Sequence, residues 1–304
     1  MTRQMKKNKK RAMKKKSKVK TLATENENLR EELSQLKAKV LQSQRQCRQA
    51  AVSSAILSMK IPIPNFEGNI ETLNKVLGIG RYGCVRLARI KSSAMVVAEK
   101  CVKQNSGDNL QVEATLSFLM SGHPYFPMIC GTTKDSLIME FIGNTCGTPG
   151  KTVRALAETD PGRDWCNVAW QIVEAFRALH GRGIIHNDIH GKNVLWHPVS
   201  QMVKVVDLGL ACLIDVPHIY NIAGTEKEAL WDQRYPHVAY EVRKVKGQPS
   251  TPQTDTFSIG VLLRNLGLKV GNEQVCNVGN ALSVNNPMKR LSLGQASKGL
   301  TSDI

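Results

Sequence analysis

The chain has 304 residues, 41% of them hydrophobic and 22% charged, which suits a globular protein of one large or two modest domains. Its apolar runs are shorter than the roughly 18 residues of a membrane-spanning helix, and its basic N-terminus lacks the apolar segment of a signal peptide. The eight cysteines are scattered, and no CxxC pair indicates a zinc or redox site. These properties argue against a membrane-spanning or secreted protein and predict a cytoplasmic or nuclear location, or both.

The positive charge is concentrated at the N-terminus. The net charge is +17, and residues 1–20 hold eleven Lys and Arg and no acidic residue, which leaves 31 basic against 25 acidic residues in the rest of the chain. A block of like charges repels itself and stays disordered, and lysine-rich blocks act as nuclear-localisation signals or bind anionic surfaces. We predict a basic disordered tail at 1–20 that contacts nucleic acid or another anionic surface, or that is simply solvated.

Residues 21–48 have the spacing of a coiled-coil helix. About three heptads are marginal for a lone helix, so this helix should pair with a partner or with a second copy of the chain. A basic run before leucine heptads is similar to basic-leucine-zipper proteins, but Ala12 stands where their phosphate-contacting residue would be, which argues against sequence-specific DNA binding. Residues 49–69 are punctuated by proline and predict a linker. The predicted seam consists of Leu22, Asn26, Leu29, Leu33, Leu36 and Val40.

From residue 70 onward the pattern predicts a β-rich part followed by a helical part. Alternating apolar residues lie on both sides of a glycine cluster, and a β-branched run follows, which together predict three strands in a meander. Further along, residues 163–183 form the pattern of an amphipathic helix that ends in two glycines. The expected fold class is α+β. The predicted buried face of this helix holds Val168, Ile172, Ala175 and Leu179.

The glycine cluster has the spacing of a phosphate-binding loop. The segment GIGRYGCV places Gly78, Gly80, Gly83 and Val85 in the pattern GxGxxGxV. Glycines suit this role because the backbone must fold tightly over phosphate oxygens and offer them its N–H groups. A dinucleotide-binding loop would open a helix, whereas a strand-like stretch follows here, so the pattern favours a loop that covers nucleotide phosphates.

A lysine and a glutamate follow this loop. Lys100 ends the strand-like segment VAEK, where a lysine can hold the α- and β-phosphates of a nucleotide. Glu113 lies on a predicted helix and is the acid that could orient it. An isolated Lys–Glu pair is more often a surface ion pair of little energetic value, but the glycine loop upstream favours the functional interpretation.

The segment IIHNDIHGKNVL at 184–195 carries further polar groups. Asp188 precedes Asn193 by five residues, and Asp207 follows a β-branched run nineteen residues after Asp188. Phosphate transfer to a hydroxyl needs a carboxylate to receive or orient its proton, and it needs oxygen ligands for Mg²⁺. Asp188 fits the first role, and Asn193 and Asp207 fit the second.

In this order and spacing the motifs resemble those of the eukaryotic protein kinase family, from about residue 70 to the end. The resemblance implies a two-lobed protein kinase domain at 70–304, with an N-lobe at 70–143, a mainly helical C-lobe at 144–304, and ATP and Mg²⁺ between them. Catalytic roles would fall to Asp188, Lys100, Asn193 and Lys192, and metal binding to Asn193 and Asp207. The ATP-binding residues that the resemblance implies are Gly78, Ile79, Gly80, Gly83, Val85, Ala98, Lys100, Glu113, Met139, Glu140, Ile142 and Leu195.

The resemblance also assigns structural roles. The segment LIMEFIG is similar to the fifth strand and hinge, with Met139 as the gatekeeper. Asp255 would hold the loop around Asp188. The segment VAYEV is similar to the Ala-Pro-Glu motif, with Tyr240 in place of proline, and it implies an ion pair between Glu241 and Arg290.

Three positions depart from the family pattern. Asn187 replaces an arginine that usually meets a phosphate on the activation segment, so we predict activity that does not depend on phosphorylation there. Leu208 replaces a phenylalanine after the metal-binding aspartate. His190 stands where serine/threonine kinases usually have a lysine that steadies the γ-phosphate, and Lys192 lies two residues further on.

The sequence favours transfer to protein hydroxyls, of serine or threonine more than of tyrosine. The segment HNDIHGKN is also similar to the loop of small-molecule kinases of the aminoglycoside and choline type. However, the complete glycine loop, VAYEV and the later segment DTFSIG are features of protein kinases. A third alternative is a pseudokinase scaffold that acts through ATP binding and the coiled coil. A scaffold would be expected to have lost Lys100, Asp188 or Asp207, and all three are present.

Overall fold

The computed structural model describes residues 53–80, 83–102, 110–225 and 227–301, and positions 31, 34, 35 and 39. The chain divides into two compact units, Met1–Ala51 and Val52–Ile304. The predicted basic tail and nearly all of the predicted coiled-coil helix lie outside the described residues. Within the described ranges, no helix combines the length and apolar character that crossing a membrane requires.

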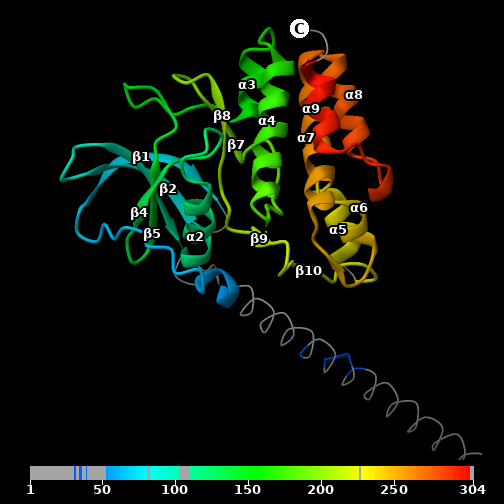
Figure 1. Cartoon of the computed structure of the whole chain (residues 1–304), viewed down its shortest axis with the longest axis horizontal. Coiled ribbons are helices and arrows are strands. Elements are labelled where there is room, and N and C mark those ends of the chain that lie inside the picture. Colours follow the sequence, from blue (N-terminus) through cyan, green and yellow to red (C-terminus); the bar gives the residue numbers. More distant parts are fainter. Residues whose placement is uncertain are drawn as a thin grey trace, which may run out of the picture. The chain divides into compact units, whose positions relative to one another are not determined.

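The N-lobe of the second unit is a five-stranded sheet in the order β1-β2-β3-β5-β4, with antiparallel pairing throughout. Its first three strands form the meander that the sequence predicts, and the glycine cluster lies between β1 and β2. Helix α2 (Leu110–Met120) lies beside the sheet (Figure 1). The strands are β1 (Ile70–Ile79), β2 (Gly83–Ile90), β3 (Val96–Val102), β4 (Ile129–Thr132) and β5 (Ser136–Glu140).

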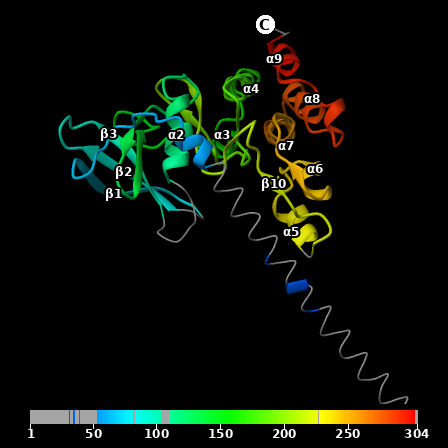
Figure 2. The ribbon, with the colours of Figure 1, turned by 60° about the horizontal axis from the view of Figure 1, so that its bottom comes forward.

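The segment before β1, predicted as a linker, is packed on the N-lobe. Residues 53–57 are helical, and Ile56 is fully buried in the same apolar cluster as Leu116 and Met120 of α2. The N–H of Phe66 donates to the carbonyl of Thr132 at 2.8 Å, which ties the segment to β4. Figure 2 also shows this short helix beside α2. The described part of the segment thus belongs to the second unit.

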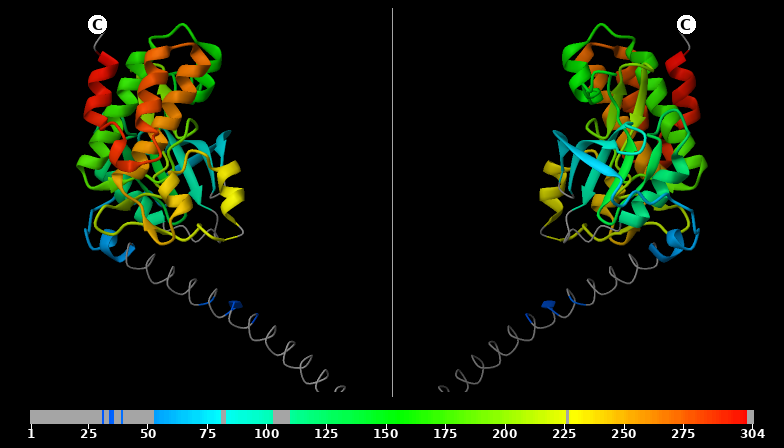
Figure 3. Two further views of the ribbon diagram at one scale, coloured as in Figure 1. Left: turned by 90° about the vertical axis from the view of Figure 1, so that its right-hand side faces the viewer. Right: turned by 90° about the vertical axis from the view of Figure 1, so that its left-hand side faces the viewer.

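The C-lobe is mainly helical; its helices lie on the side away from the sheet in Figure 1 and in front of the sheet in the left view of Figure 3. Helices α4, α7, α8 and α9 pack side by side in its core. The prediction for 163–183 is confirmed, since the four apolar residues of its expected face are all at most 1% exposed. The helices are α3 (Val153–Thr159), α4 (Trp165–Gly181), α5 (Lys227–Arg234), α6 (Tyr240–Lys244), α7 (Pro252–Val270), α8 (Glu273–Leu282) and α9 (Leu293–Thr301), with a 3-10 turn at Pro287–Lys289.

Local sequence sets where the two central helices begin. The side chain of Asp164 accepts the backbone N–H of Asn167 at the start of α4. At the start of α7, Thr251 and Thr254 form a reciprocal capping box, and Pro252 occupies the first helical turn. Such caps satisfy N–H groups that have no partner inside the helix. They fix the start of α7 three residues before Asp255, which the site uses.

Short strand pairs position the loops of the C-lobe. Strand β6 (Ile184–Ile185) pairs with β9 (Cys212–Leu213), and β7 (Val194–His197) pairs with β8 (Met202–Val205). A third pair joins β10 (Ile219–Tyr220) to β11 (Gln248–Pro249). The loop between β6 and β7 therefore carries Asp188 and Asn193, while Asp207 follows directly after β8.

The predicted ion pair between Glu241 and Arg290 is present and buried. The Arg290 guanidinium donates to both carboxylate oxygens of Glu241, at 2.7 and 2.6 Å, and also to the backbone carbonyl of Gln253 at 2.8 Å. These contacts join α6, α7 and the turn before α9. Parallel charge-assisted bonds of this kind combine strength with a fixed geometry.

We expect Arg290→Ala to lower the free energy of unfolding by about 3 to 5 kcal/mol, because it leaves the buried Glu241 carboxylate without its partner. Arg290→Lys keeps the charge but loses the two-pronged geometry, so its effect should be smaller. Urea unfolding of both variants measures this difference. An Arg290→Ala protein as stable as the wild type would show that the pair does not hold the C-lobe together.

Candidate active site

Lys100 lies between two carboxylates that come from distant parts of the chain. Its Nζ is 2.6 Å from Oε1 of Glu113 on α2 and 2.8 Å from Oδ1 of Asp207. The predicted pairing of Lys100 with Glu113 is thus present in the structure, and Asp207 is a second partner. All three side chains lie near the boundary of the two lobes, which the Lys100–Asp207 contact bridges.

Burial and charge act in opposite directions on this cluster. Burial alone would lower the pKa of Lys100, but Glu113 and Asp207 outweigh it and raise that pKa. Burial alone would raise the pKa of Asp207, but Lys100 outweighs it and lowers that pKa. Lys100 is therefore a fixed cation and Asp207 a fixed anion at neutral pH.

Asp255 of α7 holds the loop between β6 and β7, as the sequence predicts. Its carboxylate accepts the backbone N–H of His186 at 2.8 Å and that of Asn187 at 3.0 Å, and it contacts Nε2 of His180 at 2.9 Å. Asp255 is 1% exposed, so these bonds form in a dry environment where they are strong.

Asp188 and Asn193 face each other across this loop. The side-chain amide of Asn193 donates to the backbone carbonyl of Asp188 at 2.9 Å and to its carboxylate at 3.2 Å. The backbone carbonyl of Asn193 accepts the N–H of Val206 at 2.9 Å, which brings the neighbouring Asp207 to the same place. With its amide nitrogen turned toward Asp188, Asn193 leaves its side-chain oxygen for a cation, and together with the Asp207 carboxylate it forms the oxygen donor set that Mg²⁺ prefers.

Histidines surround the Asp188 carboxylate. Nε2 of His190 is 3.6 Å from its Oδ1, and the ring of His237 packs edge-on against His190 with ring centres 5.5 Å apart. Burial alone would raise the pKa of Asp188, but His190, with smaller contributions from His186 and His237, lowers it. His237 is a site residue that the sequence analysis missed. It lies 49 residues after Asp188. The one sequence feature that could have indicated its role is its position two residues before Ala239 of the VAYEV motif.

Lys192 lies apart from this group. Its side chain is exposed, and within the described part of the chain it forms no ion pair. The basic side chain that the structure brings next to Asp188 is that of His190, at 3.6 Å.

The glycine loop is described on both sides of residues 81 and 82. Gly83 is required by close packing, because a Cβ there would collide with the carbonyl oxygen of Cys101 on β3. Gly78 and Gly80 face open space, and Ile79 between them is 80% exposed. Within the described residues, a side chain at Gly78 or Gly80 would therefore not clash, in contrast to one at Gly83.

The register of the sheet aligns four of the predicted ATP-binding residues. Val85 is opposite Lys100, and Ala98 is opposite Met139, so these four residues project from one face of the sheet. The Ala98 side chain is buried, whereas those of Met139 and Val85 are half-buried.

The remaining predicted ATP-binding residues lie at the hinge and on the C-lobe. At the hinge, the N–H of Glu140 donates to Met128 and the carbonyl of Ile142 accepts from Gly150, each at 2.8 Å, so the fold already uses these two groups. Leu195 lies on β7, the C-lobe strand that directly follows Asn193.

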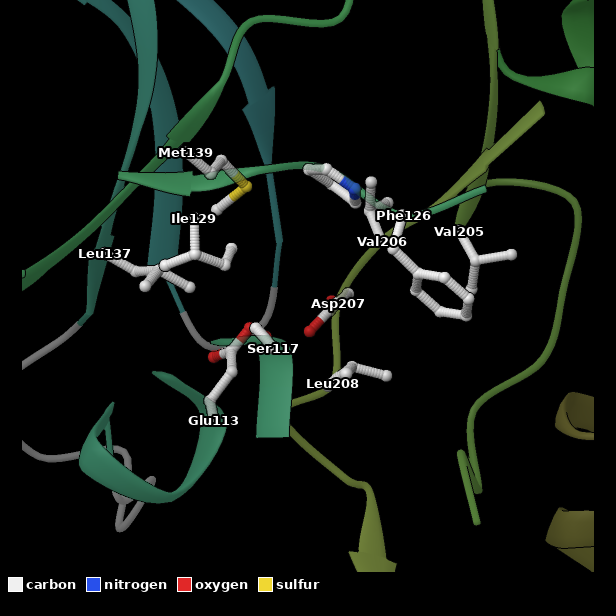
Figure 4. A pocket seen from close by; sticks show the side chains of 11 residues that line it. Glu113, Ser117, Phe126, Ile129, Leu137, Met139, Val205, Val206, Asp207 and Leu208 are labelled. Carbon is white, nitrogen blue, oxygen red and sulfur yellow. The ribbon is translucent and has the colours of Figure 1, made fainter. Parts of the chain in front are cut away.

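A small cavity lies behind Met139, between the sheet and α2 (Figure 4). Its volume of about 20 Å³ has room for about one water molecule. The carboxylates of Glu113 and Asp207 point toward each other at its edge, while Ser117 and Leu208 line it from α2 and from the segment after Asp207. The cavity therefore borders the Lys100 cluster.

Two residues of the site have left-handed backbone conformations. Asn187 has φ 66° and Asp207 has φ 69°. Asn and Asp tolerate this conformation better than other residues with a Cβ, and such positions cluster at functional sites. The side-chain amide of Asn187 donates to the carbonyl of Leu210 at 3.0 Å and contacts the sulfur of Cys212 at 3.2 Å. Leu210 and Cys212 lie at the start of the activation segment, the stretch between Asp207 and the VAYEV motif. Asn187 thus binds this segment directly.

The comparisons with known proteins agree with this arrangement. The family model described as protein kinase domain matches residues 72–289. The chain belongs to the protein kinase family, with the antiparallel N-lobe sheet and helical C-lobe expected from the sequence.

Several curated relatives are similar to the chain. A probable cAMP-dependent protein kinase catalytic subunit of Encephalitozoon cuniculi is 30% identical over 162 residues, which cover 50% of this chain and 49% of the relative. An Aurora kinase of Dictyostelium discoideum is 28% identical over 63% of this chain and 48% of the relative. A calcium/calmodulin-dependent protein kinase type 1 of Macrobrachium nipponense is 26% identical over 62% of this chain and 54% of the relative. The chain thus spans about half the length of these relatives.

Proposed function

We propose that this chain is an ATP-dependent protein kinase that transfers the γ-phosphate to protein hydroxyls, of serine or threonine more than of tyrosine. The observation that carries the proposal is the placement of Lys100 at 2.6 Å from Glu113 and 2.8 Å from Asp207. A scaffold has no need to keep a buried lysine in contact with two carboxylates that lie in different lobes. The name of one relative, a probable serine/threonine-protein kinase of Dictyostelium discoideum that is 26% identical over 62% of this chain, supports the choice of acceptor.

In the proposed reaction the residues of the chain act by position and charge. Lys100 holds the α- and β-phosphates, with Glu113 fixing its side chain. Asp188 accepts the proton of the acceptor hydroxyl, and its lowered pKa keeps it ionised for that role. Asn193 and Asp207 would hold Mg²⁺, which neutralises charge that develops on the transferring phosphate. Lys192, together with His190, would offset charge on the transferring phosphate.

Contacts that need no phosphate group join the activation segment to the catalytic loop, while ion pairs of Glu228 and Asp232 with Lys244 and Arg243 join α5 to α6. Besides the bonds from Asn187, a row of aromatic rings runs from it to the catalytic loop, with ring centres 4.9 to 6.4 Å apart between neighbours. Edge-to-face pairs of this kind add to apolar burial. These contacts support an active conformation that needs no phosphate on the segment. The row consists of Tyr220, Trp231, Tyr235, His237 and His190.

The test of the acceptor class uses purified full-length chain, labelled ATP and a mixed extract of proteins and metabolites. Label on serine and threonine of proteins is expected. Label only in small molecules would contradict the protein acceptor and favour the aminoglycoside or choline type of kinase. A chain that binds ATP without transferring label would be a scaffold.

We expect turnover to be the same, within about twofold, before and after phosphatase treatment, because position 187 has no arginine that could bind a phosphate on the activation segment.

We expect Asn187→Ala to lower turnover about tenfold, since the two lost hydrogen bonds are worth about 1 to 3 kcal/mol together. Initial rates with a protein substrate measure both effects. A large loss of turnover on phosphatase treatment would contradict this account of Asn187.

A further inference from the structure

Two cysteines that are far apart in sequence face each other across the N-lobe sheet. Cys84 on β2 is directly opposite Cys101 on β3 in the antiparallel register. Directly opposite residues project to the same face, with Cα atoms about 4.5 to 5.5 Å apart. Disulfides span Cα separations of about 4.4 to 6.8 Å. The sequence gives no sign of this pair, because seventeen residues separate the two cysteines and only the strand register brings them together.

The two thiols have different surroundings. Both are partly exposed and both are free. Arg86 lies two residues along the same face of β2, and its interaction with Cys84 is the largest cause of its raised pKa. Burial, followed by the charge of Glu99, raises the pKa of Cys101 to about 11. Because the raised pKa of Cys101 disfavours its thiolate, Cys84 is the attacking partner and Cys101 the resolving partner.

We propose that Cys84 and Cys101 form a reversible dithiol–disulfide site whose oxidant is a hydroperoxide. The Cys84 thiolate attacks one peroxide oxygen and the O–O bond breaks, which gives a sulfenic acid; the other oxygen leaves as the alcohol, or as water from hydrogen peroxide, with the proton that Cys84 lost on ionising. The Cys101 sulfur then attacks the Cys84 sulfur and displaces hydroxide, which leaves as water with the Cys101 proton. Overall, two thiols are oxidised to one disulfide, and one hydroperoxide is reduced to an alcohol and water. A dithiol such as dithiothreitol reverses the bond by exchange.

The position of the pair links it to the active site. Cys84 follows Gly83 of the glycine loop, and Cys101 follows Lys100. A disulfide needs its Cβ atoms about 3.8 Å apart, which is closer than most opposite strand residues, so it draws β2 and β3 together beside Lys100. A misplacement of about 1 Å can cost a catalytic site about a hundredfold in rate. We therefore expect oxidation to lower turnover about ten- to a hundredfold, and this part rests on the proposed kinase activity.

The test treats the reduced full-length chain with hydrogen peroxide, blocks the remaining thiols and maps peptides by mass spectrometry. A Cys84–Cys101 cross-link that dithiothreitol removes is expected, together with loss and recovery of turnover. In Cys101→Ser the cross-link is absent and dimedone labels the sulfenic acid of Cys84. Cys146→Ser, which removes an exposed cysteine from another part of the chain, should cross-link like the wild type.

Because peptide mapping needs no enzymatic activity, it separates failure of the site from failure of the proposed function. Absence of the cross-link at a peroxide concentration that oxidises Cys146 would overturn the site. A complete cross-link in a chain whose turnover is unchanged would overturn the proposed effect of the disulfide on catalysis.

Discussion

Asp188→Asn should reduce phosphate transfer by about a hundred- to ten-thousandfold while ATP binding stays nearly intact. Asparagine has the same shape as aspartate but cannot take the proton of the acceptor hydroxyl, and a positioned general base contributes a factor of this size. The hydrogen bonds around the position favour retention of the loop, because Asn193 donates to the backbone carbonyl of Asp188 as well as to its carboxylate. Steady-state turnover and the dissociation constant of ATP, measured on the same preparation, give both quantities.

Asp135→Asn is the matched control for this substitution. Asp135 is exposed in the turn between β4 and β5, and its backbone carbonyl, which the substitution keeps, accepts the N–H of Val102. Its variant should transfer phosphate at the wild-type rate. If Asp188→Asn also kept that rate, Asp188 would not be the base, and the proposed mechanism would fail.

The parts of the fold that follow from short-range patterns could be predicted from the sequence. The meander around the glycine loop follows from strand-forming runs on either side of the glycines, and helix α4 follows from the periodic spacing of its apolar residues; a sequence displays both directly. The pairing of Lys100 with Glu113 and of Glu241 with Arg290 joins distant residues. These pairs were predictable because the order of motifs resembles a known family, and spacing alone would not have given them.

Other features depend on contacts that no local pattern encodes. Ile56 lies in a stretch that is punctuated by proline and has weak periodicity, yet it is fully buried with α2. The packing of His237 on His190 depends on how the activation segment returns to the catalytic loop. The sequence showed that Asn187 lacks the charge to bind a phosphate. It could not show that the amide binds Leu210 instead, since that contact requires a left-handed backbone at position 187.

Lys100→Met should lower turnover about a hundred- to a thousandfold and should also destabilise the fold. The first effect follows from loss of a preorganised cation at the phosphates. The second follows because Glu113 and Asp207 would remain as neighbouring carboxylates without the charge between them, at a cost of about 3 to 5 kcal/mol. Lys100→Arg keeps the charge, so it should recover most of the stability, but its planar fork cannot replace a single ammonium donor and turnover should stay low.

Lys204→Met separates these two effects. Lys204 lies on β8 and is as buried as Lys100, at 9% exposure; its Nζ donates to the carboxylate of Glu140 at 2.9 Å, a group to which the proposed reaction gives no role. Its replacement should cost a similar amount of stability with a much smaller loss of turnover per folded molecule. Thermal melting measures the stability of Lys100→Met, Lys100→Arg and Lys204→Met. Turnover of the three variants is compared at a temperature where all of them are folded. Equal losses of turnover in Lys100→Met and Lys204→Met would mean that Lys100 only supports the fold, since a lysine that holds phosphates must affect the rate beyond its contribution to stability.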